Sequence, residues 1–111
     1  MRTFLICPVR GHDKTETENI VKKLEDDGFT VHWPHRDTDQ EDETGYRICC
    51  QNRDAIESAD VIHLLWDGKS KGVLFDLGMA FAMGKKIIPL EMPPQTSHKS
   101  FQNMVSEWAQ K

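Results

Sequence analysis

The chain has 111 residues, of which 38% are hydrophobic and 29% charged, and its formal net charge is −4. This length suits one domain, residues 1–111, with a buried core, and the mixed composition excludes intrinsic disorder. The acidic balance argues against a nucleic acid polymer as partner, and no apolar run is long enough to cross a membrane. Three cysteines make no disulfide framework and no signal-peptide pattern opens the chain, so we expect a cytoplasmic protein.

Predicted strands and helices alternate along the chain. Short apolar runs bounded by turn residues predict strands, and apolar residues at helical spacing predict helices. We expect four strands, at residues 3–7, 29–33, 61–66 and 86–90. We expect four helices, at residues 15–27, 46–58, 72–83 and 101–108, and a polar loop at residues 34–44. Thr15 with Glu18 resembles a capping box that begins the first helix, and Gly28 ends it.

This alternation predicts an α/β fold. Continuous apolar strands separated by helices are typical of a parallel sheet that is covered on both faces. We therefore expect a Rossmann-like or flavodoxin-like three-layer sandwich around a central parallel sheet of about four or five strands. A ligand should lie at the carboxyl ends of strands 3–7 and 61–66, where the strand order reverses. The loops that follow these strands, 8–12 and 67–72, carry glycines and cationic residues, which suits an anion.

Asp76 is the single acid in segment 70–84, which is otherwise mostly small or apolar. It follows strand 61–66 in the first turns of a helix, where a carboxylate aimed into a pocket can attack or stabilise a cationic carbon. If its side chain faces water instead, it is an ordinary acid near a helix start, favoured by the helix dipole. The pattern alone leaves both interpretations open.

The residues of loops 8–12 and 67–72 suit a nucleoside or nucleotide as ligand. Arg10 can grip a phosphate with its planar guanidinium, while the Ser70 hydroxyl and the Gly72 amide assist. Asp76 would then face the sugar, and Trp33, at a strand end, can stack on the base. Each of these residues also has a purely structural interpretation. Arg10 can tie down its own loop, Ser70 can cap the helix, Gly72 can serve the turn, and Trp33 can belong to the core. Histidines and cysteines lack metal-ligand spacing, so no metal is expected.

Four segments share their order and spacing with a known family. They are Cys7-Pro-Val-Arg-Gly11, Ala59-Asp60-Val-Ile, Ser70-x-Gly-Val-x-Phe-Asp76-Leu-Gly78 and Gly84-Lys85. Together they resemble the nucleoside 2-deoxyribosyltransferase superfamily, and most of all its 2′-deoxynucleoside 5′-monophosphate N-glycosidases. The resemblance implies a Rossmann-like sheet, a homodimer or larger homo-oligomer, and no metal or organic cofactor.

The resemblance also assigns roles to residues. The family's nucleophile, a Glu, falls on Asp76, which is one methylene shorter, and its phosphate-binding serine falls on Ser70. An Arg-Gly pair of the first loop falls on Arg10 and Gly11. A helical Asp that assists proton transfer or positions the sugar falls on Asn52, whose amide can hydrogen-bond the sugar but cannot act as a base.

Two functions follow from the pattern and its departures. The first is an N-glycosidase or deoxyribosyltransferase that acts on (deoxy)nucleosides or nucleoside 5′-monophosphates, with Asp76 and Asn52 as catalytic residues. The second is a catalytically weak or inactive nucleotide-binding module, because a displacement of about an ångström slows an enzyme steeply. A protein-interaction domain is a third class, which nucleotide binding would exclude.

Overall fold

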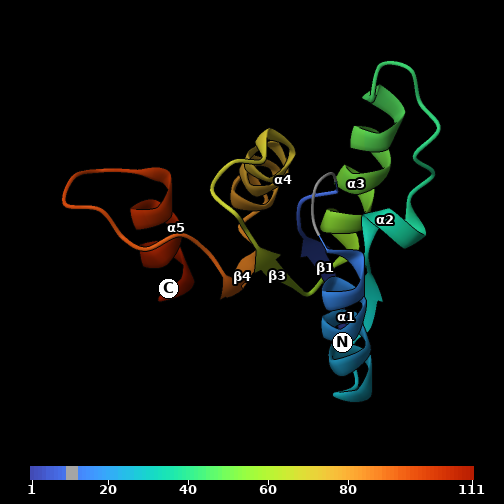
Figure 1. Cartoon of the computed structure of the whole chain (residues 1–111), viewed down its shortest axis with the longest axis horizontal. Helices are drawn as coiled ribbons and strands as arrows, with labels where there is room; N and C mark the ends of the chain where they lie inside the picture. Colours follow the sequence, from blue (N-terminus) through green and yellow to red (C-terminus); the bar gives the residue numbers. More distant parts are fainter. Residues whose placement is uncertain (10–12) are drawn as a thin grey trace.

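The computed structural model describes residues 1–9 and 13–111 (Figure 1). Its elements run β1 (Arg2–Ile6), α1 (Lys14–Asp26), β2 (Thr30–His32), α2 (Pro34–Asp37), α3 (Tyr46–Ser58), β3 (Val61–Leu65), α4 (Lys71–Ala82), β4 (Lys86–Glu91) and α5 (Phe101–Ala109). No helix among the described residues is long and apolar enough to cross a membrane.

The four described strands form one parallel sheet in the order β2-β1-β3-β4. In the central pair, Phe4 lies opposite Ile62 and Ile6 opposite Leu64. The predicted α/β fold with a parallel sheet is therefore confirmed. The chain leaves β1 toward β2 on one side and returns to β3 on the other, so the strand order reverses between the tips of β1 and β3.

The core forms two clusters because successive strand residues point to opposite faces of the sheet. Phe4 and Ile6 belong to the larger cluster, with residues of α3, α4 and α5. Leu5 and Cys7 belong to the smaller one, which α1 covers with Val21 and Leu24. All five residues of β3 are buried, as expected for a central strand of a covered sheet.

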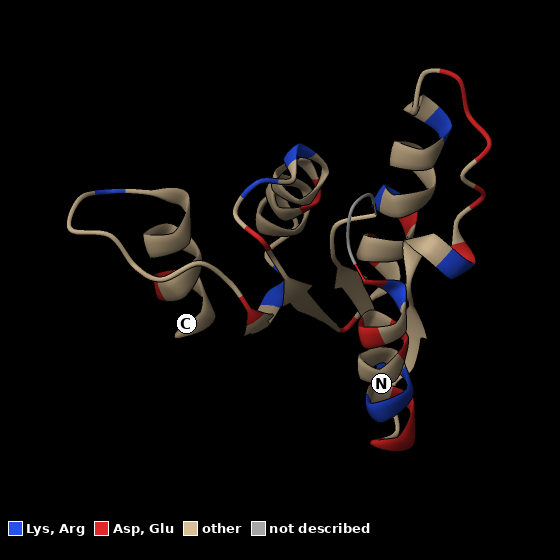
Figure 2. Cartoon of the chain, viewed as in Figure 1, with Lys and Arg blue, Asp and Glu red and all other residues tan. Residues whose placement is uncertain are grey.

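Every predicted strand and helix is present, with bounds within one residue of the prediction, and two differences have a visible physical cause. Helix α1 begins at Lys14, because the Asp13 carboxylate accepts from the Thr15 amide at 2.9 Å and caps the helix one residue earlier than the predicted start. The first part of the predicted loop 34–44 is a short helix, α2, which begins with Pro34 at a position where a missing N–H costs nothing. The acids that follow α2 lie along the loop that leads to α3 (Figure 2).

Two local devices hold α3 and α4 in place at the sheet. The Lys85 ammonium donates to the carbonyls of Glu57 and Ala59, both at 2.8 Å, and so neutralises the end of α3. Ser70 begins α4, since its hydroxyl oxygen accepts from the Val73 amide at 3.3 Å. Val73, Leu77 and Ala80 form the buried face of α4.

Candidate active site

A hollow of about 540 Å³ lies beyond the tips of β1 and β3, next to the first turns of α4. Its volume is within the range of small-molecule sites. Ser70, Gly72 and Asp76 all line it, so three predicted site residues share one hollow. The remaining lining residues come from the end of β1 and the 67–72 loop, and they are Cys7, Val9, Asp67, Lys69 and Lys71.

Asp76 projects from the second turn of α4 and is half-buried. Burial raises the pKa of its carboxyl from 3.8 to about 7. Among the described residues, no group is hydrogen-bonded to this carboxyl. A carboxyl that lines a hollow, with a raised pKa and unused oxygens, is a candidate functional group.

The charge of Asp76 contributes to the raised pKa values of two thiols, those of Cys7 and Cys49. Burial raises the pKa of the Cys7 thiol to about 12, while a hydrogen bond from the Trp33 side chain lowers it and the charge of Asp76 raises it. Burial also raises the pKa of the Cys49 thiol, again with the charge of Asp76 as a further cause. Cys7 and Asp76 line the same hollow, and Cys49 belongs to α3, which packs against the helix of Asp76. With their pKa values raised, both thiols stay protonated at neutral pH, and a protonated thiol is a weak nucleophile.

The 67–72 loop presents polar groups to the hollow. The Asp67 carboxylate accepts from the amides of Lys69 and Ser70 at 2.9 and 3.0 Å. These backbone hydrogen bonds lower the pKa of Asp67, so this second carboxylate of the hollow is ionised where Asp76 is half protonated. Basic residues lie along the chain where the loop enters α4 (Figure 2).

Ser70 and Gly72 both line the hollow and both belong to the start of α4. The Ser70 oxygen caps α4, and its O–H has no acceptor among the described residues, so it can donate into the hollow. A Cβ on Gly72 would meet only Ser70 Oγ, at 3.8 Å, so the fold itself has room for a side chain there. The amide of Gly72 belongs to the first turn of α4, where N–H groups have no partner within the helix.

Asn52 is buried in α3 but does not line this hollow. Its Oδ1 accepts from the Thr38 hydroxyl at 2.9 Å, and Thr38 Oγ1 lies 2.8 Å from His32 Nε2. Because the Thr38 proton goes to Asn52, His32 Nε2 must be the donor to Thr38. Burial lowers the pKa of His32, which keeps the ring neutral. Asn52 thus ties α3 to the end of β2 through a chain of three side chains.

Trp33 is also buried, at 6% exposure, in the smaller core cluster. Its ring lies 5.2 Å from that of His35, and its side chain is hydrogen-bonded to the Cys7 thiol. Trp33 is absent from the lining of the hollow and reaches it only through Cys7. Arg10 and Gly11 lie outside the described residues, and their assignment to a phosphate stays a prediction.

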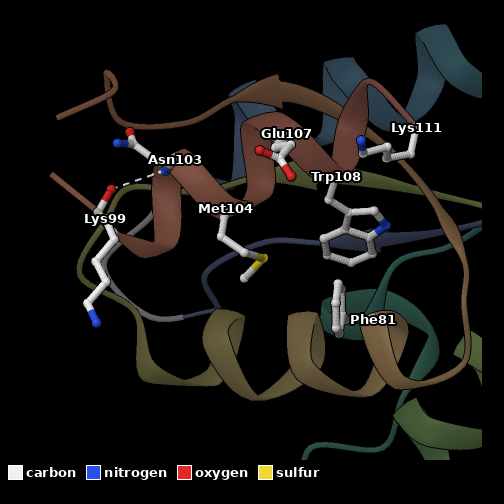
Figure 3. A pocket seen from close by; sticks show the side chains of 8 residues that line it. Phe81, Lys99, Asn103, Met104, Glu107, Trp108 and Lys111 are labelled. Carbon is white, nitrogen blue, oxygen red and sulfur yellow. Dashed lines mark hydrogen bonds between the residues drawn. The ribbon is translucent and has the colours of Figure 1, made fainter. Parts of the chain in front are cut away.

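A second hollow, of about 590 Å³, lies between α4 and α5 (Figure 3). Phe81, Met104 and Trp108 line it, with the rings of Phe81 and Trp108 edge to face at 5.3 Å. Its polar lining consists of Lys99, Ser100, Asn103, Glu107 and Lys111, and none of the predicted site residues is among them. We therefore place the candidate site at the smaller hollow around Asp76, on chemistry rather than size.

Sequence reasoning did not assign Asp67, Lys69 or Lys71 to the site, although they line the hollow. They belong to the loop that the strand order predicts at the site, so their position was foreseeable. The hydrogen bonds of Asp67 depend on the loop conformation, which residue types alone do not reveal. Among residues 1–9 and 13–111, no three His, Cys, Asp or Glu side chains gather in a way that could hold a metal ion.

Comparison with solved structures finds several enzymes of similar fold. The CMP N-glycosidase BcmB of Clostridium botulinum is 27% identical, with 80% of this chain and 70% of that chain covered and a TM-score of 0.60. The 2-deoxyribosyltransferase of Bacillus psychrosaccharolyticus is 18% identical over 96% of this chain and 81% of that chain, with a TM-score of 0.74. The enzyme of the same type from Leishmania mexicana is 22% identical over 85% of this chain and 66% of that chain, with a TM-score of 0.65.

Curated proteins give no significant match. The model of the nucleoside 2-deoxyribosyltransferase family, however, matches residues 4–106, which is nearly the whole chain. The family and the structural neighbours support an N-glycosidase or deoxyribosyltransferase activity in general. With its parallel sheet and the hollow at the tips of β1 and β3, the chain belongs to the nucleoside 2-deoxyribosyltransferase family.

Proposed function

We propose that this protein cleaves or transfers the N-glycosidic bond of a (deoxy)nucleoside or nucleoside 5′-monophosphate, with Asp76 at the anomeric carbon. One observation supports this most strongly. The half-buried Asp76 carboxyl lines the same hollow as the Ser70 hydroxyl and has no hydrogen-bond partner among the described residues. In a nucleotide, the sugar carries the base at C1′ and the phosphate at the 5′ position. A carboxylate and a phosphate-binding group at one site match these two ends.

The chemistry follows from the charge that develops on the sugar. As the bond between C1′ and the base nitrogen breaks, its electron pair leaves with the base, which takes up a proton, and positive charge grows on C1′. The ionised Asp76 carboxylate can stabilise this charge or form a glycosyl ester with C1′. In hydrolysis, the oxygen of a water then bonds to C1′, the carboxylate is released, and the proton that the water loses balances the one that the base took up. In transfer, the nitrogen of a second base takes the place of the water.

The phosphate end of the ligand is proposed to lie against the start of α4. Ser70 can donate its hydroxyl, and the Gly72 amide belongs to the unpaired N–H groups of the first helical turn. Lys69 and Lys71 line the same hollow and bring positive charge to it. Arg10 and Gly11 are expected to complete this end from the loop after β1. No metal or organic cofactor is needed for this chemistry.

A nucleotide-binding module with weak turnover or none is the second candidate. The position of Asn52 favours it, because this amide is buried, bonded to Thr38 and absent from the hollow. It therefore offers neither a base nor a contact to the sugar in the present geometry. Asp76 is also one methylene shorter than the Glu that the family resemblance places there. Saturable binding of nucleotides without release of base would support this alternative.

We further propose that two copies of the chain associate through α3 and α4. Tyr46 and Phe75 are 76% and 57% exposed, and with Met79 they line a mostly apolar hollow of about 420 Å³ between these helices. Exposed apolar patches of this kind mark interaction sites. Phe75 directly precedes Asp76 in α4, so a second copy on this face would lie near the proposed active site. The protein is proposed to act in the cytoplasm.

Base release provides the test of the activity. The protein is incubated with the four common deoxynucleoside monophosphates, the matching deoxynucleosides and CMP, and free base is separated by chromatography. We expect release from at least one substrate, and its loss in Asp76→Asn, which keeps the shape of the side chain without its charge. Release that persists undiminished in this variant would remove Asp76 from the role. Binding measured by calorimetry without any release would favour the binding module.

A further inference from the structure

The 67–72 loop is held in shape from within by one side chain. Oδ1 of Asp67 accepts from the amides of Lys69 and Ser70, at 2.9 and 3.0 Å. This arrangement closes the turn that carries the chain from β3 into α4. The next link follows directly, because Ser70 Oγ accepts from the Val73 amide and begins the helix. Asp67 therefore sets the position of Ser70 on the hollow.

The same loop is held from behind by the segment that follows β4. Gly68 has a φ of +80°, a conformation that side chains rarely adopt. A Cβ at Gly68 would lie 2.8 Å from Cγ of Pro93, so the loop backbone rests directly on this ring. With Asp67 on one side and Pro93 on the other, little freedom remains for the loop to move away from the hollow. Preorganised groups bind a ligand at a lower entropic cost.

The negative charge of Asp67 is unfavourable for binding a phosphate in this hollow. Its carboxylate lines the hollow, and its hydrogen bonds keep it ionised by lowering its pKa. An anionic ligand would be repelled by this charge, although Lys69 and Lys71 line the same hollow. Its two backbone hydrogen bonds give Asp67 a structural role in the loop that does not depend on attraction to the ligand.

We propose that Asp67 is a positioning residue for the phosphate end of the ligand, acting through the Ser70 hydroxyl and the backbone of the loop. This inference rests on the proposed function, in which Ser70 and the start of α4 receive a 5′-phosphate. Asp67 acts as a hydrogen-bond acceptor rather than as a charge. Its effect should therefore be confined to ligands that carry a phosphate, and an uncharged acceptor should replace it.

Two variants of Asp67 separate the acceptor from the charge. Asp67→Asn keeps the acceptor oxygen, with its amide checked by intact mass, whereas Asp67→Ala removes it, and both lack the charge. KM and kcat are measured for a deoxynucleoside monophosphate and for its nucleoside. We expect KM for the monophosphate to be about tenfold higher in the alanine variant than in the asparagine variant. KM for the nucleoside should agree between the two variants within about twofold, because the nucleoside lacks the phosphate that Ser70 and the loop are proposed to hold.

Asp39→Ala is the matched control. Asp39 also accepts from a backbone amide two residues on, that of Glu41 at 3.0 Å, but it lies in the loop before α3 and does not line the hollow. It should leave both KM values as in the wild type. Equal KM values for the monophosphate in the two Asp67 variants would overturn the inference, and so would equal losses for nucleotide and nucleoside. Wild-type protein that neither binds nor converts any nucleotide would instead overturn the proposed function.

Discussion

Replacing Asp76 by Asn should stabilise the folded protein at neutral and alkaline pH. The folded pKa of about 7 against the ordinary 3.8 means that ionising this half-buried carboxyl costs at most about 4 kcal/mol. The cost is absent below the unfolded pKa, grows as pH rises from about 4 to about 7, and is constant above that. Asp76→Asn removes it, so the variant should gain up to about 4 kcal/mol at pH 8, roughly 15 °C in Tm.

Urea unfolding of both proteins at pH 4, 5.5 and 8 measures this difference in the free energy of unfolding. The two proteins should agree at pH 4 and diverge as pH rises. Asp42→Asn is the control of opposite sign, because the amide of Ile48 and neighbouring amides lower the pKa of Asp42. Its stabilisation is present above the unfolded pKa and is lost as pH falls through the folded one, so that variant should be weaker at pH 8. Parallel stability curves for wild type and Asp76→Asn would refute the buried-carboxylate reasoning.

Three further predictions concern activity, the loop and assembly. Base release should fall as pH drops, to about half of its high-pH plateau at pH 7 and about a tenth of it at pH 6, since only the ionised Asp76 can stabilise the cation; a rate that rises on acidification would contradict this. Gly68→Ala should destabilise the fold by about 2 kcal/mol in thermal unfolding, because its φ is +80° and Pro93 blocks the Cβ; unchanged stability would show that the loop yields freely. Phe75→Glu should shift the protein from dimer to monomer in sedimentation velocity, with its helical circular dichroism retained; a wild-type monomer would refute the proposed interface.

Most of the fold could be predicted from the sequence because its strands and helices carry clear periodicity. The five buried residues of β3 and the spaced apolar residues of α5 are examples. Helix α2 could not be predicted in this way, since its four residues complete barely one turn. The start of α1 was placed late because both Asp13 and Thr15 are good caps, and only the observed hydrogen bond decides between them.

In the candidate site, too, the features that depend on local sequence could be predicted, and those that depend on tertiary contacts could not. Ser70, Gly72 and Asp76 share one loop and helix start, so local sequence was enough to bring them to a single hollow. The surroundings of Asn52 and Trp33 depend on contacts across the fold. Asn52 is bonded to Thr38, which is brought to it by α2, and Trp33 is covered in the smaller core cluster. Sequence spacing carries no information about such contacts.

The distance between the Asp76 carboxylate and C1′ of a bound nucleoside monophosphate tests the central claim most directly. A crystal structure of the complex provides it, whether or not the protein turns the ligand over. We predict a carboxylate oxygen within about 3.5 Å of C1′, the separation from which bond formation begins. A ligand seated elsewhere, or an Asp76 side chain turned away from the sugar, would contradict the account.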